Sequence, residues 1–385
     1  MTLLTNAVVI TGEGGATGGW LRTDGERVAQ VGTGEPGGQA GETAVDLGGA
    51  SVVPGFVDIH CHGGNGERYT TVDGAAARKV ADFHAANGTT TCMGSLVTAR
   101  LDLLERQIST LAPLVEEGVL AGIHLEGPWI SRQCKGAHDE TLLAEPAAED
   151  VQRMLAAAGR HLRMVTLAPE LPGGLDAVRT LVASGVVVAV GHTAAEASVV
   201  DEALAAGATV ATHLFNGMPL MSHRAPGPVG ALLTSSSDVV LELICDGHHI
   251  DPRVLKLAID HVGPERIALI TDAMAAAGVG DGTYSLGDLD VVVSGGAARL
   301  ADSGSLAGST LTMAAAVRFV VREVGRPLAD AVTMASVNPA RVLGRSDVGV
   351  LAAGRRADLV VLDDDLRPSG VMRAGEWLRR PGGQM

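Results

Sequence analysis

The sequence is poor in several features that would place it in a specialised class of protein. Its 385 residues include only four cysteines, at positions 61, 92, 134 and 245, without paired spacing. Scattered cysteines argue against a disulfide framework and fit a reducing compartment, so a cytoplasmic protein is expected. No apolar run approaches the ~20 residues of a membrane span. Residues 1–15 lack the basic and then apolar pattern of a secretory signal, so neither a leader nor a membrane partner is expected.

Clusters of basic residues are also missing. The formal net charge is -15 and the isoelectric point is about 5.2, without any block of lysine and arginine. Nucleic acid is therefore not expected as a partner. An anionic substrate would need a local basic pocket set against this acidic surface.

The length suits one large α/β domain with a smaller appendage. Short strand patterns with glycine-rich turns occupy the first 50 residues, and a similar pattern returns near residues 357–362. Neither piece can bury a core alone. We therefore predict a small β-sandwich domain built from residues 1–52 and 345–385, with a large domain at residues 53–344 inserted between them.

Eight strand patterns alternate with helical patterns in the large domain. Strands are expected at residues 52–59, 89–93, 120–125, 164–168, 186–190, 209–212, 239–244 and 267–270. Many are short, wholly apolar runs, which are typical of parallel strands covered on both faces. Eight such units favour an α/β fold of the (β/α)8 TIM-like barrel type. A doubly wound sheet is the alternative, but it would place a glycine-rich turn after the first strand, where His60-Cys61-His62 stands.

Two segments interrupt this alternation. Residues 129–145 form a long polar segment, which we interpret as a candidate lid. Residues 284–306 are predicted to form an extra hairpin before the last helix. Cys134 lies in the candidate lid. An inert, exposed thiol is the plain interpretation of Cys134, and contact with substrate when the lid closes is the sharper hypothesis.

Side chains that can bind metals follow the predicted strands at the points where the strands end. They are His60 and His62 after the first strand, Glu126 after the third, His192 after the fifth, His213 after the sixth and Asp272 after the eighth. The strand ends of a barrel meet at one face, where active sites lie. Each residue alone is compatible with an ordinary polar strand end. Together, these metal-binding residues at the ends of neighbouring strands predict a catalytic metal site.

The ligand types indicate the chemistry. Histidine and carboxylate ligands suit Zn²⁺ or Fe²⁺ and do not settle which is used. Such a metal lowers the pKa of a bound water from 15.7 to ~7 and polarises a carbonyl. Asp272 is the natural proton shuttle, and a role as a plain metal ligand can coexist with it. Glu126 can bridge two metals, with His60 and His62 on one and His192 and His213 on the other.

These residues lie in segments that resemble the amidohydrolase superfamily and, within it, the N-acetylglucosamine-6-phosphate deacetylases. The matching segments are residues 54–63, 124–128, 135–138, 191–193, 212–218, 246–249, 271–273 and 306–313. The sequences His-Leu-Glu-Gly-Pro at 124–128 and His-Leu-Phe-Asn-Gly-Met at 213–218 are the most specific to the deacetylases. The resemblance implies hydrolysis of the acetamido group of N-acetyl-D-glucosamine 6-phosphate, which gives D-glucosamine 6-phosphate and acetate.

The resemblance also implies roles for single residues. Glu126, His192 and His213 would be the main ligands, and keeping both His60 and His62 resembles the two-metal members, so one or two divalent metals per subunit are expected. Asp272 would act as general base and acid, and His138 would hold the carbonyl or the sugar hydroxyls. The other implied substrate contacts are Ala137, Asn216, Gly217, Arg224, His249, Leu306, Ala307 and Gly308. The family's arginine reaches across from a partner subunit, which implies a homodimer with Arg224 donated to the neighbouring site.

Other interpretations remain open on sequence alone. A cyclic-amide hydrolase of the dihydroorotase type usually bridges two metals with a modified lysine after strand four, where this chain has Ala-Pro-Glu at 168–170. A deaminase of the adenosine deaminase type would not need Arg224 for a phosphate. A metal-binding scaffold without activity predicts a lost ligand or a lost proton shuttle, and the sequence keeps both.

Overall fold

The computed structural model describes residues 1–14 and 16–382. The chain divides into two compact units. Unit 1 comprises Met1–Asp58, His84–Thr91 and Thr312–Met385, and unit 2 comprises Ile59–Phe83 and Cys92–Leu311. The sequence-based boundaries after residues 52 and 344 stay a prediction, and each unit is described separately below.

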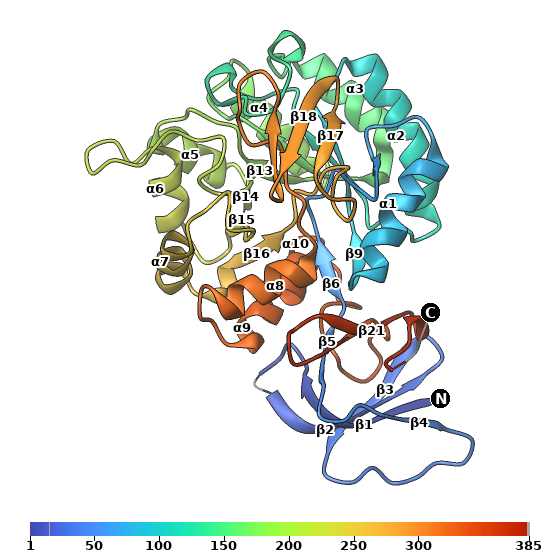
Figure 1. Cartoon of the computed structure of the whole chain (residues 1–385). Helices are drawn as coiled ribbons and strands as arrows, with labels where there is room; N and C mark the ends of the chain where they lie inside the picture. Colours follow the sequence, from blue (N-terminus) through green and yellow to red (C-terminus); the bar gives the residue numbers. More distant parts are fainter. Residues whose placement is uncertain (15, 383–385) are drawn as a thin grey trace. The chain divides into compact units, whose positions relative to one another are not determined.

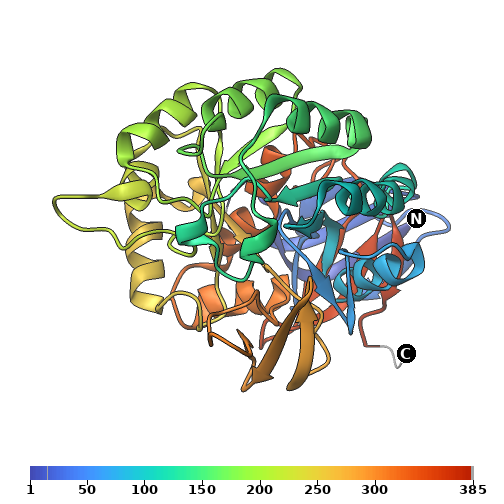
Figure 2. The same cartoon turned by 90° about the horizontal axis from the view of Figure 1, so that it is seen from above.

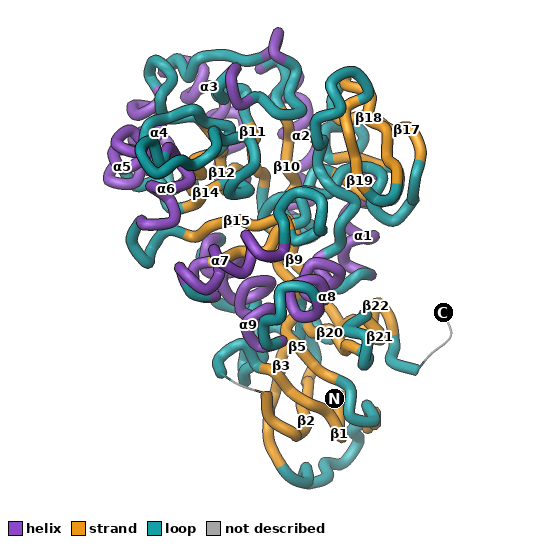
Figure 3. Tube along the Cα trace, turned by 60° about the vertical axis from the view of Figure 1, so that its left-hand side comes forward, coloured by secondary structure: helices purple, strands orange, loops and turns teal. Residues whose placement is uncertain are grey.

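Unit 1 carries a mainly antiparallel sheet drawn from both ends of the chain (Figure 3). The strand order is β22-β21-β20-β5-β1-β2-β3, and β4 pairs with β1. The strands are β1 (Thr2–Ile10), β2 (Ala16–Asp24), β3 (Arg27–Thr33), β4 (Thr43–Asp46), β5 (Ser51–Pro54), β20 (Leu359–Leu362), β21 (Pro368–Arg373) and β22 (Glu376–Arg379). Val9, Leu21, Val52 and Leu359 share one buried cluster. The two ends of the chain therefore build a common β domain, as the sequence predicts.

Unit 2 is organised by a parallel sheet in the order β10-β11-β12-β13-β14-β15-β16 (Figure 1). The strands are β10 (Gly94–Val97), β11 (Ile123–Glu126), β12 (Leu162–Leu167), β13 (Val187–Val190), β14 (Val210–Ala211), β15 (Val240–Ile244) and β16 (Ile267–Ile270). The helices between them are α2 (Leu101–Glu116), α3 (Ala148–Ala158), α4 (Gly174–Ala183), α5 (Ala197–Ala205), α6 (Gly227–Thr234) and α7 (Pro252–Val262). Viewed from above, these teal to yellow helices lie outside the curled strands (Figure 2). This strand and helix alternation confirms the TIM-like barrel fold.

The first two predicted strands are each broken in two. Residues 52–59 divide into β5 and β6 (Phe56–Asp58), and β5 pairs with β20 whereas β6 pairs with β9 (Thr89–Cys92). The break falls at Gly55, where an added Cβ would lie 2.1 Å from Thr90 Oγ1, so this close approach requires glycine. The second predicted strand continues past Met93 as β10. An unbroken hydrophobic pattern concealed both breaks, because all of these residues except Ser51 are buried.

The predicted interruptions are present with more structure than expected. The candidate lid contains short 3-10 turns at Arg132–Cys134 and Glu140–Leu142. The extra hairpin is a three-stranded sheet of β17 (Gly282–Leu286), β18 (Leu289–Ser294) and β19 (Ala297–Leu300), visible in Figure 3. The remaining elements are β7 (Gly63–Gly64), β8 (Glu67–Arg68), α1 (Gly74–Ala86), α8 (Met313–Arg322), α9 (Leu328–Val332), α10 (Asn338–Val342), two 3-10 turns at Gly159–His161 and Pro264–Arg266, and a π-helical turn at Thr333–Val337.

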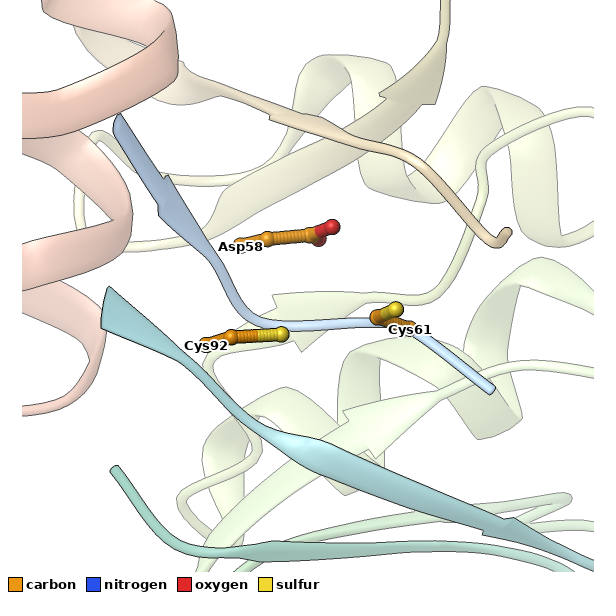
Figure 4. Close-up of side chains that lie close together, drawn as sticks. All are labelled: Asp58, Cys61 and Cys92. Carbon is orange, nitrogen blue, oxygen red and sulfur yellow. The ribbon is translucent and has the colours of Figure 1, made fainter. Parts of the chain in front are cut away.

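Most of the cysteine side chains lie in the protein interior. All four cysteines are in described segments and none of them forms a disulfide there, and Cys61, Cys92 and Cys245 are buried. Figure 4 shows Cys61 and Cys92 together with Asp58, where β6 and β9 end. The Cys92 thiol lies 3.3 Å from the carbonyl oxygen of Met93, in keeping with a packing role.

Within the described ranges, no helix has both the length and the hydrophobicity to cross a bilayer.

Candidate metal centre

The backbone presents the candidate ligands at the ends of parallel strands. Glu126 is the last residue of β11, and His192, His213 and Asp272 each stand two residues beyond the end of their strand. These last three have positive φ angles of 46°, 26° and 47°. A non-glycine residue in this left-handed region costs roughly 1–3 kcal/mol, and such strain gathers at functional sites. The chain therefore turns sharply at three of the positions that the sequence singles out.

Four imidazoles converge on one carboxylate. The Nε2 atoms of His192 and His213 lie 3.1 and 3.0 Å from Glu126 Oε1. The other carboxylate oxygen, Oε2, lies 3.1 Å from His62 Nε2, and His60 Nε2 lies 3.4 Å from Oε1. The side chain of Glu126 thus stands between the two histidine pairs, in the position that a bridging ligand would take.

The Nε2 atoms also face each other in pairs. The distance is 3.0 Å between His60 and His62, and 3.1 Å between His192 and His213. On the opposite side of each ring, Nδ1 donates to an oxygen acceptor, and the acceptors are Glu242 Oε2 for His60, Ser95 O for His62, Cys134 O for His192 and Asn216 O for His213. A neutral imidazole that donates from Nδ1 carries a lone pair on Nε2. Facing lone pairs at this distance fit a cation between them, which is the usual arrangement of metal-binding histidines.

The surroundings of the His62 and His60 rings also favour positive charge in the site. Burial acts to lower the pKa of His62, but hydrogen bonds to Asp272 and Glu126 raise it to about 9. Burial likewise opposes a charge on His60, yet Glu126 and Glu242 raise its pKa well above the usual value. Buried carboxylates surrounded by imidazoles need a compensating cation, which a divalent metal supplies without protonating the rings.

Of the three groups of donor atoms in the described residues that are compact enough to hold a metal ion, two lie among these side chains, and the third is Asp58, Cys61 and Cys92. Of the first two, one consists of His60, His62 and Asp272, and the other contains Glu126, His138 and His192. His213 joins the second group through its short distances to Glu126 and His192. The residue types and the spacing therefore fit one or two divalent cations.

Asp272 and His138 complete the reactive end of the site. Burial acts to raise the pKa of Asp272, but the hydrogen bond from His62 and the charge of His60 bring it to about 2, so this carboxylate is ionised near neutral pH. Burial lowers the pKa of His138 to about 4, so its ring is neutral. Nδ1 of His138 lies 2.8 Å from Thr98 Oγ1, which leaves Nε2 directed at the Glu126 group.

These side chains open into a cavity of about 210 Å³, called the ligand cavity below. Its lining brings together the following sequence-predicted residues: His62, Glu126, Ala137, His138, His192, His213, Asn216, Gly217, His249, Asp272, Leu306 and Gly308. His60 lies beneath them, fully buried. At one end His249 is held by Asp246, whose carboxylate lies 2.7 Å from His249 Nδ1.

Besides His60, three predicted site residues lie outside this lining. Ala307 is fully buried in an apolar cluster under β17–β19. Arg224 is exposed on the loop between β14 and α6, which projects at the left of Figure 1. Cys134 is half-buried, and its main-chain oxygen, rather than its thiol, contacts the site, accepting a hydrogen bond from His192 Nδ1 at 2.7 Å.

Sequence reasoning missed the layer of residues behind the ligands. Glu242 lies inside β15, fully buried, and its carboxylate accepts from His60 Nδ1 and from the backbone N–H of His213. The only available signal was an acidic residue inside the otherwise apolar stretch of 239–244. A charged side chain in such a run is seldom tolerated without a partner. Ser95 was missed as well, because it is its main-chain oxygen that binds His62.

Comparison with known proteins points to one family. The family model described as the amidohydrolase family matches residues 51–378. The N-acetylgalactosamine-6-phosphate deacetylase of Escherichia coli O157:H7 is 40% identical over 328 residues, which cover 84% of this chain and 86% of that protein. The N-acetylglucosamine-6-phosphate deacetylase of Bos taurus is 36% identical over 345 residues, which cover 86% of this chain and 84% of that protein.

Solved structures agree. One of them is a mutant of the N-acetyl-D-glucosamine-6-phosphate deacetylase from Mycobacterium smegmatis, in which alanine replaces an aspartate, in complex with N-acetyl-D-glucosamine-6-phosphate. It is 47% identical to this chain, with a TM-score of 0.94, and the match covers 98% of this chain and 99% of that one.

Proposed function

This chain belongs to the amidohydrolase family, and we propose that it is a metal-dependent deacetylase of N-acetyl-D-glucosamine 6-phosphate. The products would be D-glucosamine 6-phosphate and acetate. The observation that carries the proposal is the convergence of four imidazole Nε2 atoms and two carboxylates in one cavity. The activity named for the Bos taurus relative at 36% identity and the Mycobacterium smegmatis protein at 47% identity supports the choice of substrate.

His60, His62, Glu126, His192, His213 and Asp272 would hold the cation or cations. When bound, a divalent metal supplies a Lewis acid that polarises the amide carbonyl and acidifies a water molecule. Histidine and carboxylate donors suit Zn²⁺ or Fe²⁺. Nδ1 of each imidazole is already held by an oxygen acceptor, which turns Nε2 toward the other ligands, so little rotation of the rings is needed on binding.

Proton transfer falls to Asp272. Its carboxylate, with a pKa of about 2, accepts a proton from the attacking water and then delivers it to the departing amine nitrogen. Neutral His138 donates from Nε2 to the carbonyl oxygen as negative charge develops there, while Thr98 fixes its ring. Because Asp272 is 9% exposed and His138 is 5% exposed, little bulk water competes for these groups.

His249, Asn216 and Gly217 in the lining of the ligand cavity would take the sugar phosphate. Asp246 orients the His249 ring by accepting from its Nδ1. The lining residues, all of them described, include no arginine or lysine. A dianionic phosphate would therefore be left without a permanently charged partner in a single chain.

A second copy of the chain would supply that partner. Arg224 lies on an exposed loop together with Leu220, which is 96% exposed, and Met221, which is 55% exposed. Exposed apolar side chains around an arginine suit a protein interface. We therefore propose a homodimer in which Arg224 of the partner subunit binds the phosphate.

A second candidate substrate is the 4-epimer, N-acetyl-D-galactosamine 6-phosphate, because the relative at 40% identity carries that activity. Both sugars share the acetamido group and the phosphate, so the cavity chemistry above serves either. Release of acetate from each sugar, with kcat/KM measured for the two at equal metal loading, decides between them. A higher value for the galactosamine epimer would reverse the assignment, and release of acetate from neither would contradict the proposed reaction.

A further inference from the structure

Unit 2 contains a second cavity beside the ligand cavity. It measures about 340 Å³, against about 210 Å³ for the ligand cavity. Val97, Ala137, His138 and Leu286 line both cavities. These four residues therefore stand between the two spaces, and the reaction proposed above makes no use of the second one.

The shared wall is largely apolar. Val97 ends β10 and Leu286 ends β17, and they are 6% and 7% exposed. Both belong to one hydrophobic cluster, against which Ala137 packs. His138, also in the wall, is held by its hydrogen bond to Thr98. A shorter side chain at Val97 or at Leu286 would therefore open the wall between the two cavities.

The chemistry of the substrate decides which part of it meets this wall. The amide nitrogen is attached to the sugar, so the acyl carbons beyond the carbonyl project away from the sugar and its phosphate. His249, which marks the proposed phosphate end, lines the ligand cavity but not the second cavity, whereas Val97 and Leu286 line both. An acyl group that points away from the phosphate therefore extends toward the shared wall.

We propose that Val97 and Leu286 restrict the enzyme to a two-carbon acyl group, and that the second cavity receives longer acyl chains once this wall is shortened. The inference rests on the proposed deacetylase function and adds the determinant of its acyl specificity. In the intact protein the acetyl methyl group packs against Val97, Ala137 and Leu286. Each extra methylene then meets the wall, where a steric mismatch of this size discriminates by ~10–200-fold.

The test compares two substrates that differ in acyl length alone, N-acetyl- and N-butanoyl-D-glucosamine 6-phosphate. The quantity is the ratio of kcat/KM for the butanoyl substrate to that for the acetyl substrate. Leu286→Ala and, independently, Val97→Ala should raise this ratio by about tenfold or more. Leu289→Ala is the matched control, because Leu289 is the cross-strand partner of Leu286 and lines the second cavity only. Its ratio should stay at the wild-type value.

A second step separates entry into this cavity from general loosening of the site. In the Leu286→Ala background, Leu103→Phe adds bulk to the second cavity, since Leu103 lines that cavity alone. The ratio should then fall back toward the wild-type value. A ratio unchanged in both wall variants, with acetyl turnover still measurable, overturns the inference, as does a raised ratio that the added phenylalanine does not reduce. A wild-type protein that releases no acetate overturns the proposed function itself, so the two failures are distinguishable.

Discussion

Nδ1 of His60 lies 3.1 Å from the carboxylate of Glu242, and neither side chain is exposed. This contact fixes the His60 ring with Nε2 toward the other candidate ligands. Glu242→Gln keeps the size of the side chain and removes its charge. We expect metal affinity or activity to fall by about 10–100-fold, as for other partners of metal-binding histidines. The dissociation constant of Zn²⁺, measured by competition with a chelating dye, checks this. An unchanged dissociation constant would show that Glu242 does not support metal binding.

Asp272→Asn should abolish most turnover while leaving the substrate bound. The amide keeps the shape of the carboxylate but cannot accept a proton from water, so kcat should fall by about 10²–10⁴-fold. KM should change much less, because the sugar and phosphate contacts are intact. Steady-state kinetics at saturating metal measures both constants. A variant that keeps near wild-type kcat would show that another group moves the proton.

The pH profile of the wild-type protein provides the control for this role. A carboxylate whose pKa is depressed to about 2 stays ionised until the pH approaches that value. Lowering the pH from 8 to 6 at saturating metal should therefore leave Asp272 charged, so a fall of kcat in this range reports another group, such as a metal-bound water with a pKa of ~7. The residual activity of Asp272→Asn should show the same acid limb, and a limb that is absent from this variant would contradict the assignment.

Gly217→Ala should weaken the metal site through His192. A Cβ at Gly217 would lie 2.8 Å from His192 Nδ1, so the ring would have to move from its hydrogen bond with the Cys134 carbonyl. Gly227→Ala is the matched control, because Gly227 has a similar φ of 57° but nothing within 4 Å of its added Cβ. Both variants carry the backbone strain, so only the contact differs. Metal retained after dialysis should fall in Gly217→Ala alone, and equal losses in both would refute the contact.

Mixing two inactive variants tests the donated arginine. Arg224→Ala lacks the proposed phosphate partner, and Asp272→Asn lacks the proton shuttle. A hybrid dimer contains one complete site, made of Asp272 from one subunit and Arg224 of the partner subunit. Co-refolded or co-expressed mixtures should therefore release acetate well above either parent. If the mixture shows only the average of the parents, Arg224 acts within its own chain or not at all.

Whether a site residue can be predicted from the sequence depends on its position relative to the strands and on whether its side chain or its main chain contacts the site. His192, His213 and Asp272 were predictable because they directly follow short apolar strands, and parallel strands bring their ends together. Glu242 was not, because a residue within a strand gives no sign of the ring it will meet across the sheet. The role of the Cys134 thiol stays a prediction, whereas the hydrogen bond that its carbonyl accepts from His192 could not be predicted, because main-chain atoms are the same in every residue.

The most direct test of the central claim is acetate release from N-acetyl-D-glucosamine 6-phosphate by the purified protein, with bound metal counted on the same sample. We predict one or two divalent ions per chain, turnover that disappears on chelation, and recovery when Zn²⁺ or Fe²⁺ is returned. A fully metal-loaded, folded sample that leaves the acetamido group intact would contradict the account, as would turnover that survives complete removal of the metal.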